Sequence, residues 1–287
     1  TWKPLGTGYL RDDIITTHYI LNYNMDFPVL IEESEQTPGR YRLVDAYRQS
    51  PKFDTRQPDF PEDAKNYIIV DASDPDCVWL EPGGTSVWVG VDQHMLLWSM
   101  ADDVINNGSP EASEDEVKGK MVQGVITFPT NTILSAFTDK AEIDNATFVP
   151  TGGVDVQQWR RSNSGGMFRI MLPGVPQHDI DMEAIDINET EDGVNYQFTL
   201  DEPINYALVA AFKGNYTEDM AEKIKKGEVT TVKVDKSGIF PVPYTEDGII
   251  TVVAVPYVDG TAYIASHQTR TWSYSQKEWK KLKGKAI

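Results

Sequence analysis

The chain has 287 residues, of which 40% are hydrophobic and 24% charged, and this composition argues against an intrinsically disordered protein. Asp and Glu number 44 against 26 Lys and Arg, so the formal charge of −18 disfavours binding to nucleic acid or to anionic lipid surfaces. Such a surface tolerates cations and uncharged ligands such as sugars, and no run approaches the roughly 18 apolar residues of a transmembrane segment.

The N-terminal part of the chain reads as short strands separated by turns. Val29–Glu33 and Tyr41–Ala46 flank Thr37-Pro38-Gly39, a sequence typical of a type II turn, and so predict a hairpin. His94–Ile105 fits either a short helix or a strand, while Phe148–Gly166 is rich in turn residues. Further strands are predicted at Tyr67–Asp71, Cys77–Leu80, Thr85–Val91, Val122–Phe128, Thr132–Phe137 and Met167–Leu172.

The clearest linker in the chain is Pro173-Gly174-Val175-Pro176. We therefore expect a mainly β protein of two domains, with a β-rich N-terminal domain at 1–172, a second domain at 177–275 and a basic tail at 276–287. One large β domain is the alternative that the length leaves open.

The second domain shows about seven strand patterns within roughly 100 residues, the number expected of an antiparallel β-sandwich of the immunoglobulin or fibronectin type III kind. One short helix is predicted at Thr217–Lys226, with Thr217 as its N-cap and Gly227 after its end. The strands are predicted at Ile180–Ile187, Val194–Leu200, Tyr206–Phe212, Val229–Val234, Gly238–Val242 and in the C-terminal hairpin.

That hairpin turns at Asp259-Gly260, a dipeptide that favours a type I′ turn, after the apolar strand Ile249–Tyr257. The turn predicts that Val258 faces Thr261, that Val255 faces Ile264 and that Val252 faces His267. Pro256 has no backbone N–H to donate, so we expect a bulge or a strand end there. Val253 and Val255 are expected inside the sandwich.

Motifs of catalysis are not visible in the sequence, and we expect a non-enzymatic protein without a cofactor. There is no Gly-x-Ser-x-Gly elbow, and the four histidines do not have the spacing of zinc ligands. The adjacent pairs Asp12-Asp13 and Asp102-Asp103 point to opposite faces if they lie on strands, which disfavours a two-carboxylate hydrolase. The single cysteine, Cys77, excludes an intramolecular disulfide, and we expect a buried inert thiol.

Aromatic and acidic residues supply the candidate binding sites. Sugars stack on exposed aromatic rings, and the candidates are Trp159 in a polar run and Trp88 and Trp98, which with Trp79 lie within twenty residues, although core packing is the alternative for this group. Calcium binds oxygen ligands, and Asp71, Asp74 and Asp76 alternate around a turn as candidates for a structural ion, with plain turn chemistry as the alternative.

Several stretches resemble a broad group of secreted or outer-membrane lipoproteins of gut anaerobes, in which a β-rich region precedes a fibronectin-like domain. These stretches are WKPLGTGYLRDD, VLIEESEQTPGRYRLVDAY, YIIVDASDPDCVWL, GVITFPTNTIL and DGIITVVAVPYVDG. The resemblance implies export to the periplasm or cell surface and a lipid anchor on an upstream cysteine. The chain begins at Thr1 rather than at Met, and we expect that a leader has been removed.

These observations favour an exported surface binding or scaffold protein. By analogy with members that accompany polysaccharide capture, a glycan is the first candidate ligand, and another surface protein is the second. The alternatives are a glycan-processing hydrolase that uses two carboxylates, and a structural spacer, adhesin or assembly component.

Overall fold

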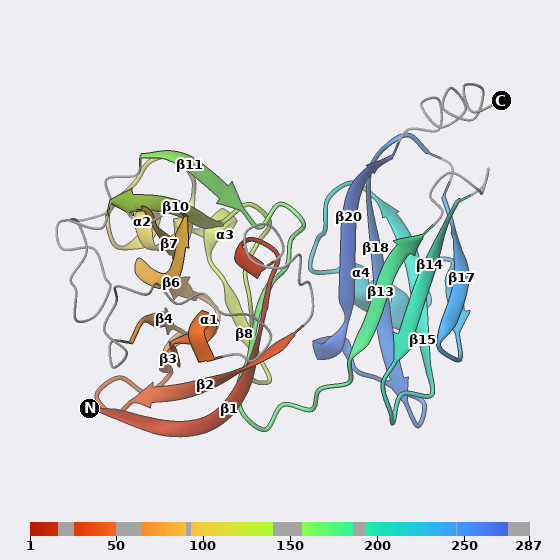
Figure 1. The fold of residues 1–287 in the computed structure, drawn as a ribbon, viewed down its shortest axis with the longest axis horizontal. Helices are drawn as coiled ribbons and strands as arrows, with labels where there is room; N and C mark the ends of the chain where they lie inside the picture. Colours follow the sequence, from red (N-terminus) through yellow and green to blue (C-terminus); the bar gives the residue numbers. More distant parts are fainter. Residues whose placement is uncertain are drawn as a thin grey trace. The chain divides into compact units, whose positions relative to one another are not determined.

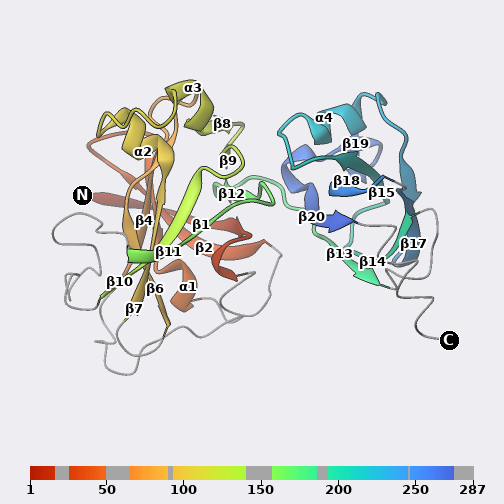
Figure 2. The ribbon, with the colours of Figure 1, turned by 90° about the horizontal axis from the view of Figure 1, so that it is seen from above.

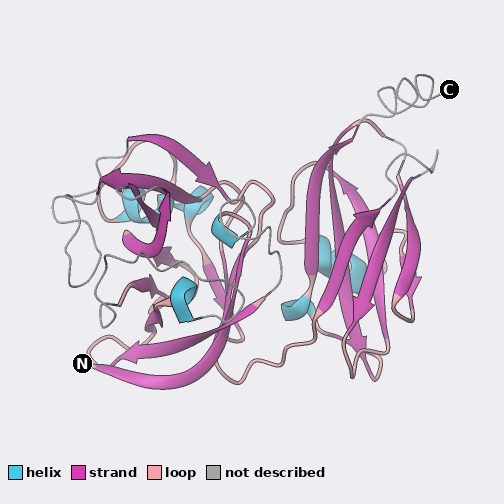
Figure 3. Ribbon diagram, viewed as in Figure 1, coloured by secondary structure: helices cyan, strands magenta, loops and turns pink. Residues whose placement is uncertain are grey.

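A computed structural model of the chain describes residues 1–16, 26–49, 65–89, 93–139, 157–185, 193–244 and 246–274. The described chain is mainly β, with antiparallel sheets and a few short helices, as the sequence predicted (Figure 3). It divides into two compact units, Thr1–Val175 and Pro176–Ile287. The division falls within the Pro173–Pro176 linker.

The first unit is built on an eight-stranded sheet in which the long curved strands β1 and β2 run side by side (Figure 1). Its two ends approach each other, because Val78 and Gly119 form a bridge in which each N–H donates to the other carbonyl, at 3.0 and 2.7 Å. A Cβ on Gly119 would lie 2.7 Å from the Phe128 ring and 2.8 Å from the Thr127 carbonyl oxygen, so a larger residue would not fit at this position without a shift of its neighbours. In sheet order the strands are β5 (Trp79–Leu80), β4 (Tyr67–Asp71), β3 (Arg40–Val44), β2 (Phe27–Ser34), β1 (Trp2–Asp12), β12 (Phe168–Met171), β9 (Val125–Thr127) and β8 (Lys120–Val122).

A second, four-stranded sheet completes this unit. Its order is β11 (Gln157–Ser162), β10 (Ile133–Asp139), β7 (Gln93–Ser99) and β6 (Gly83–Val89). Both sheets contribute buried apolar side chains to one core, for example Leu10 and Leu43 from the first sheet and Met95 and Ile133 from the second. The short helices are α1 (Ala46–Gln49), α2 (Met100–Ile105) and α3 (Glu114–Val117).

The sequence predicted the short-range features of this unit well. The hairpin of β2 and β3 is confirmed, and the ambiguous segment at 94–105 contains both predicted states, since β7 leads directly into α2. Val122–Phe128 is not one strand, because Gln123 and Gly124, with φ of 49° and 78°, turn the chain between β8 and β9. The turn-rich reading of Phe148–Gly166 is wrong where β11 forms, and 148–156 lies outside the described residues.

The second unit contains two antiparallel sheets that share one core. Buried side chains from both sheets, such as Tyr196, Phe198, Val209 and Val252, belong to the same apolar cluster. One sheet has the order β13 (Ile180–Ile185), β14 (Gly193–Leu200) and β17 (Gly238–Pro243). The other contains β16 (Val232–Val234), β15 (Tyr206–Lys213) and β18 (Gly248–Val258), with β19 (Thr261–Ala262) and β20 (Gln268–Tyr274) both paired to β18.

Helix α4 (Met220–Lys225) packs on the other face of the sheet that contains β15 and β18 (Figure 2). Val253 and Val255 are fully buried as expected, but they belong to the cluster under α4 rather than to the core between the sheets. Alternation along β18 accounts for this, since Val252 and Ala254 take the side that faces the second sheet. The helix starts later than predicted, and Asp219 rather than Thr217 occupies its N-cap position.

The C-terminal hairpin keeps the predicted register only near its turn. Val258 pairs with Thr261, but Val252 pairs with Arg270 and not with His267, because a 3-10 helix at Ile264–Ser266 interrupts the second strand. The carbonyl of Pro256 accepts a bond from Tyr263 on that side. The nitrogen of Pro256 faces this same side and has no hydrogen to donate, so the hydrogen bonds between β18 and the returning segment are interrupted at Pro256.

We expect Val255→Asp to lower the free energy of unfolding by about 3 kcal/mol or more, because it places an unpaired carboxylate in the apolar cluster under α4. Thermal or urea unfolding followed by circular dichroism measures the change. Ile249→Asp is the matched control on the same strand, since Ile249 is 42% exposed, and it should change stability by less than about 0.5 kcal/mol. Equal effects of the two variants would contradict the placement of Val255.

Candidate functional site

The outer face of the eight-stranded sheet carries an ordered set of side chains, most of them polar or aromatic, which we call the outer grid. The core face takes alternate residues such as Ile31, Leu43 and Ile68, so the residues between them point outward. Across β1 to β5 and the residue that follows β5, the outer grid consists of Trp2, Pro4, Leu30, Glu32, Ser34, Arg40, Arg42, Val44, Tyr67, Ile69, Asp71, Trp79 and Glu81. Trp2, Tyr67 and Trp79 are all half-buried.

Arg42 occupies the middle of the outer grid. Its guanidinium carbon lies 4.6 Å from the centre of the Trp2 ring and 3.9 Å from that of the Tyr67 ring, and the group also pairs with Glu32. Cation–π contacts of this kind hold flat side chains in one orientation. Trp2 and Tyr67 are therefore fixed on the rigid sheet rather than free to rotate.

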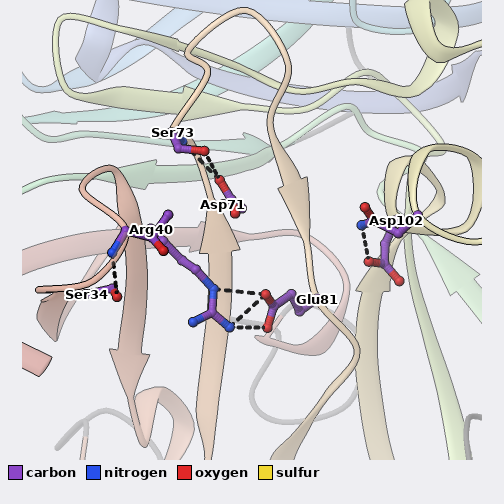
Figure 4. A network of polar contacts seen from close by, with 8 residues as sticks. Ser34, Arg40, Asp71, Ser73, Glu81 and Asp102 are labelled. Atoms are coloured by element: carbon purple, nitrogen blue, oxygen red, sulfur yellow. Dashed lines mark hydrogen bonds and ion pairs between the residues drawn. The ribbon is translucent and has the colours of Figure 1, made fainter. Parts of the chain in front are cut away.

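Arg40 forms the second ion pair of the outer grid. Its Nε and Nη2 atoms donate to the Glu81 carboxylate at 2.8 to 3.0 Å, in the bidentate geometry that gives the strongest Arg–carboxylate bonds (Figure 4). Arg40 also lies over the Trp2 ring, at 5.2 Å from its centre. The side chains of this pair are each 28% exposed, so hydrogen-bonding groups of both can contact a ligand.

A second group of charged residues lies at the end of β1 and is buried. Arg11 and Arg169 are cross-strand neighbours on β1 and β12, and Arg169 donates to both oxygens of Asp26, at 2.9 and 3.1 Å. The Arg169 and Asp26 side chains have no exposed surface. A buried pair of this kind is costly to break, because the remaining charge would be left in the interior.

Asp12 and Asp13 adjoin this group but have different partners. The Asp12 carboxylate accepts bonds from the Tyr47 hydroxyl at 2.5 Å and from the N–H groups of Ile14 and Ile15. Asp13 accepts a bond from the N–H of Met167, and burial raises its pKa to about 8, with the charge of Asp12 adding to the rise. The two carboxylates are held by separate elements, and this arrangement gives no support to joint action on one glycosidic bond.

A serine, a histidine and an aspartate also meet in the interior of the first unit. The Nε2 atom of His94 accepts the backbone N–H of Ser86 at 2.9 Å, and Asp45 accepts the Ser86 hydroxyl at 3.3 Å. A catalytic triad instead needs the imidazole between the serine oxygen and the carboxylate. Burial lowers the pKa of His94 to about 3, so the ring is neutral and fixes the chain where Ser86 takes a positive φ of 62°.

The three predicted sugar-binding tryptophans all fall in the four-stranded sheet. Trp98 on β7 is only 3% exposed and donates to Asp103 at 3.2 Å, so its ring packs in the interior instead of facing solvent. Trp88 lies on β6 opposite His94, and Trp159 lies on the end strand β11. The side chains of Trp88 and Trp159 lie outside the described residues.

The candidate calcium ligands Asp71, Asp74 and Asp76 form turn bonds instead of gathering. Asp71 accepts bonds from the N–H and hydroxyl of Ser73, and Asp74 accepts the N–H of Asp76 (Figure 4 shows the Asp71 contact). Within the part of the chain that the structure describes, no three His, Cys, Asp or Glu side chains form a group that could hold a metal ion. The geometry therefore agrees with turn chemistry at this position.

Cys77 is half-buried rather than fully buried, and its Sγ lies 3.4 Å from a carboxylate oxygen of Glu114. Burial and this carboxylate raise the pKa of the thiol to about 11, so it stays protonated and unreactive at neutral pH.

Sequence reasoning missed both the outer grid and the buried charges. Alternation in RYRLV, where Arg40 and Arg42 flank an inward-facing tyrosine, was the signal available for the outer grid. No local pattern distinguishes Arg11, Asp26 and Arg169 from surface charges, because only the pairing of β1 with its neighbours brings them together.

Comparison with known proteins gives no match, since no family model, no curated protein and no solved structure is significantly similar to this chain. A search of the described residues finds no helix with the length and apolar character needed to span a membrane.

We expect Asp13→Asn to flatten the pH dependence of stability. In the folded chain the carboxyl keeps its proton up to a pH of about 8, whereas in the unfolded chain it loses it near 3.8, so stability falls as the pH rises between these values. The amide cannot ionise, and the variant should therefore gain stability relative to the parent from pH 4 to pH 8.

Urea unfolding at a series of pH values measures this difference. Asp115→Asn is the control, because Asp115 is exposed and a hydrogen bond from Lys118 lowers its pKa instead of raising it. A constant difference between Asp13→Asn and the parent across this pH range would show that Asp13 is ionised in the folded state.

Proposed function

We propose that the protein is a non-enzymatic binding or scaffold protein whose ligand-contacting surface is the outer grid, and that carbohydrate is the ligand class. The observation that carries this proposal is the arrangement of half-buried aromatic rings and ion-paired arginines on one rigid sheet face. Sugar rings present CH-rich faces that pack on aromatic rings, while their hydroxyls need hydrogen-bonding groups at the edge.

The outer grid offers both kinds of contact. Trp2, Tyr67 and Trp79 supply flat apolar surface, and the fixed orientation of Trp2 and Tyr67 lowers the entropy cost of binding. Arg40 and Glu81 supply donors and acceptors that remain partly exposed after they pair with each other. These are the properties of a preorganised recognition surface.

Two further parts of the proposal concern location and fold class. Export to the periplasm or cell surface, with a lipid anchor on an upstream cysteine, rests on the resemblance to lipoproteins of gut anaerobes. Metabolic labelling of the full-length precursor with a palmitate analogue in its host, followed by cell fractionation, tests this location, and an unlabelled protein in the cytosol would contradict it.

We also propose that the second unit is a sandwich of the immunoglobulin or fibronectin type III kind. In support, the first, second and fifth strands of this unit form one sheet, and the third, fourth, sixth and seventh form the other, when the two-residue strand β19 is set aside. A fragment of residues 177–275 should fold alone in a two-state transition with dispersed amide signals in NMR spectra. A fragment that stays unfolded would contradict an independent sandwich domain.

A glycan array with the full chain tests the binding proposal. We expect binding to plant or host polysaccharides that Trp79→Ala weakens by about tenfold, since a lost aromatic contact is worth about 1.4 kcal/mol. Trp79 lies on β5 opposite Asp71 of β4, on the face away from the core. The substitution therefore leaves the core residues Tyr41, Val70 and Leu80 in place.

Ile239→Ala is the control, because it removes an exposed apolar side chain, 57% accessible, from the other unit. Both variants should melt as cooperatively as the parent. Failure of the parent to bind any glycan would end the carbohydrate proposal and favour the structural spacer, adhesin or assembly alternative.

A further inference from the structure

We infer that the outer grid takes a linear, uncharged oligosaccharide that lies across the strands and reaches both Trp2 and Trp79. This inference rests on the proposed function and adds the charge, length and orientation of the ligand. It follows from the spacing of the two tryptophans and from the pairing of the charges between them.

The two tryptophans stand at opposite ends of the outer grid. Trp2 lies on β1 and Trp79 on β5, and the sheet order places β2, β3 and β4 between them. Four steps of about 4.8 Å between neighbouring strands separate the two backbone positions by about 19 Å along the sheet surface. The Trp2 ring reaches toward β3, since its centre lies 4.6 Å from the guanidinium carbon of Arg42, and about two strand steps, or about 10 Å, remain between that strand and β5. A single sugar ring contacts one of the two tryptophans at a time, whereas an extended chain that runs perpendicular to the strands contacts both.

The charges between the tryptophans compensate one another. Arg40 pairs with Glu81 and Arg42 pairs with Glu32, and Asp71 adds one further carboxylate that Ser73 binds. The outer grid thus holds two positive and three negative side chains, on a chain whose formal charge is −18. An acidic polysaccharide would meet no uncompensated cation here and would be repelled by the whole chain. A basic one would meet no exposed unpaired carboxylate, because Glu32 and Glu81 are paired with arginines and Asp71 is buried, so we infer an uncharged ligand.

The middle of the outer grid provides hydrogen bonds for such a chain. The side chains of Arg42 and Glu32 are 19% and 21% exposed, and each has hydrogen-bonding capacity beyond a single ion pair. Because the guanidinium is held by the rings of Trp2 and Tyr67, its remaining donors keep a fixed direction. Hydroxyls of a sugar chain that crosses β3 would meet these groups between the two aromatic contacts.

Calorimetric titration of the full chain with neutral xylose and glucose oligomers of increasing length tests the inference, with oligogalacturonates of matched length as the charged comparison. We expect affinity for the neutral series to rise with length and then level off, and oligogalacturonates to bind at least about tenfold more weakly. Trp2→Ala and Trp79→Ala should each reduce the affinity of the longest neutral oligomer by about tenfold. Each should change the affinity of a monosaccharide by no more than about twofold, because a single sugar ring contacts one tryptophan at a time.

Trp79→Phe keeps a flat ring and should restore most of the lost affinity, which separates loss of stacking from local unfolding. Ile239→Ala should bind like the parent. Equal binding of acidic and neutral oligomers, or affinity that does not depend on length, would overturn this inference while leaving the carbohydrate proposal in place. Failure of every oligomer and polysaccharide to bind would overturn both.

Discussion

Strict alternation of side chains across the eight-stranded sheet is the constraint on which the first unit depends. The register of β2, β3 and β4 sends Ile31, Leu43 and Ile68 into the core and leaves the intervening residues on the other side. A slip of one residue would bury Arg42 and expose Leu43, so the apolar core fixes the register of the strands. The register in turn determines which residues belong to the outer grid. The apolar core and the outer grid therefore occupy opposite faces of the same strands.

Along β1 the outer face passes from partly exposed side chains near Trp2 to buried charged ones near Asp12. A bulge between Pro4 and Gly6 shifts the pairing with β2, so that Tyr9 and Arg11 lie on the side of Trp2 although the simple alternation would place them inward. At the Asp12 end of β1 the side chains on this face are buried, and they include the Arg169–Asp26 ion pair. Burying these charges is expensive, and a different register of β12 against β1 would separate Arg169 from Asp26 and leave a buried charge without its partner.

The sequence predicted the local features and missed the long-range ones. The turns at Thr37–Gly39 and at Asp259-Gly260 are written in residues that favour particular backbone angles, and both hairpins form there. The bulge or strand end expected at Pro256 is wrong for β18, which continues to Val258 in unbroken register with β15. The interruption lies in the partner segment, where a 3-10 helix shifts the pairing by three residues. Trp98 shows the same limit, because aromatic content identifies a candidate ring but not the sheet that covers it.

The bridge between Val78 and Gly119 has a consequence for how the chain behaves at high concentration. An open sheet exposes unsatisfied amide and carbonyl groups along its outermost strands, and these are templates for joining one molecule to the next. Here the outermost strands β5 and β8 have only two and three residues, and the backbone beside them is already bonded across the seam. The two ends of the curled sheet are thereby occupied by each other, so this sheet offers another molecule little free backbone at its seam.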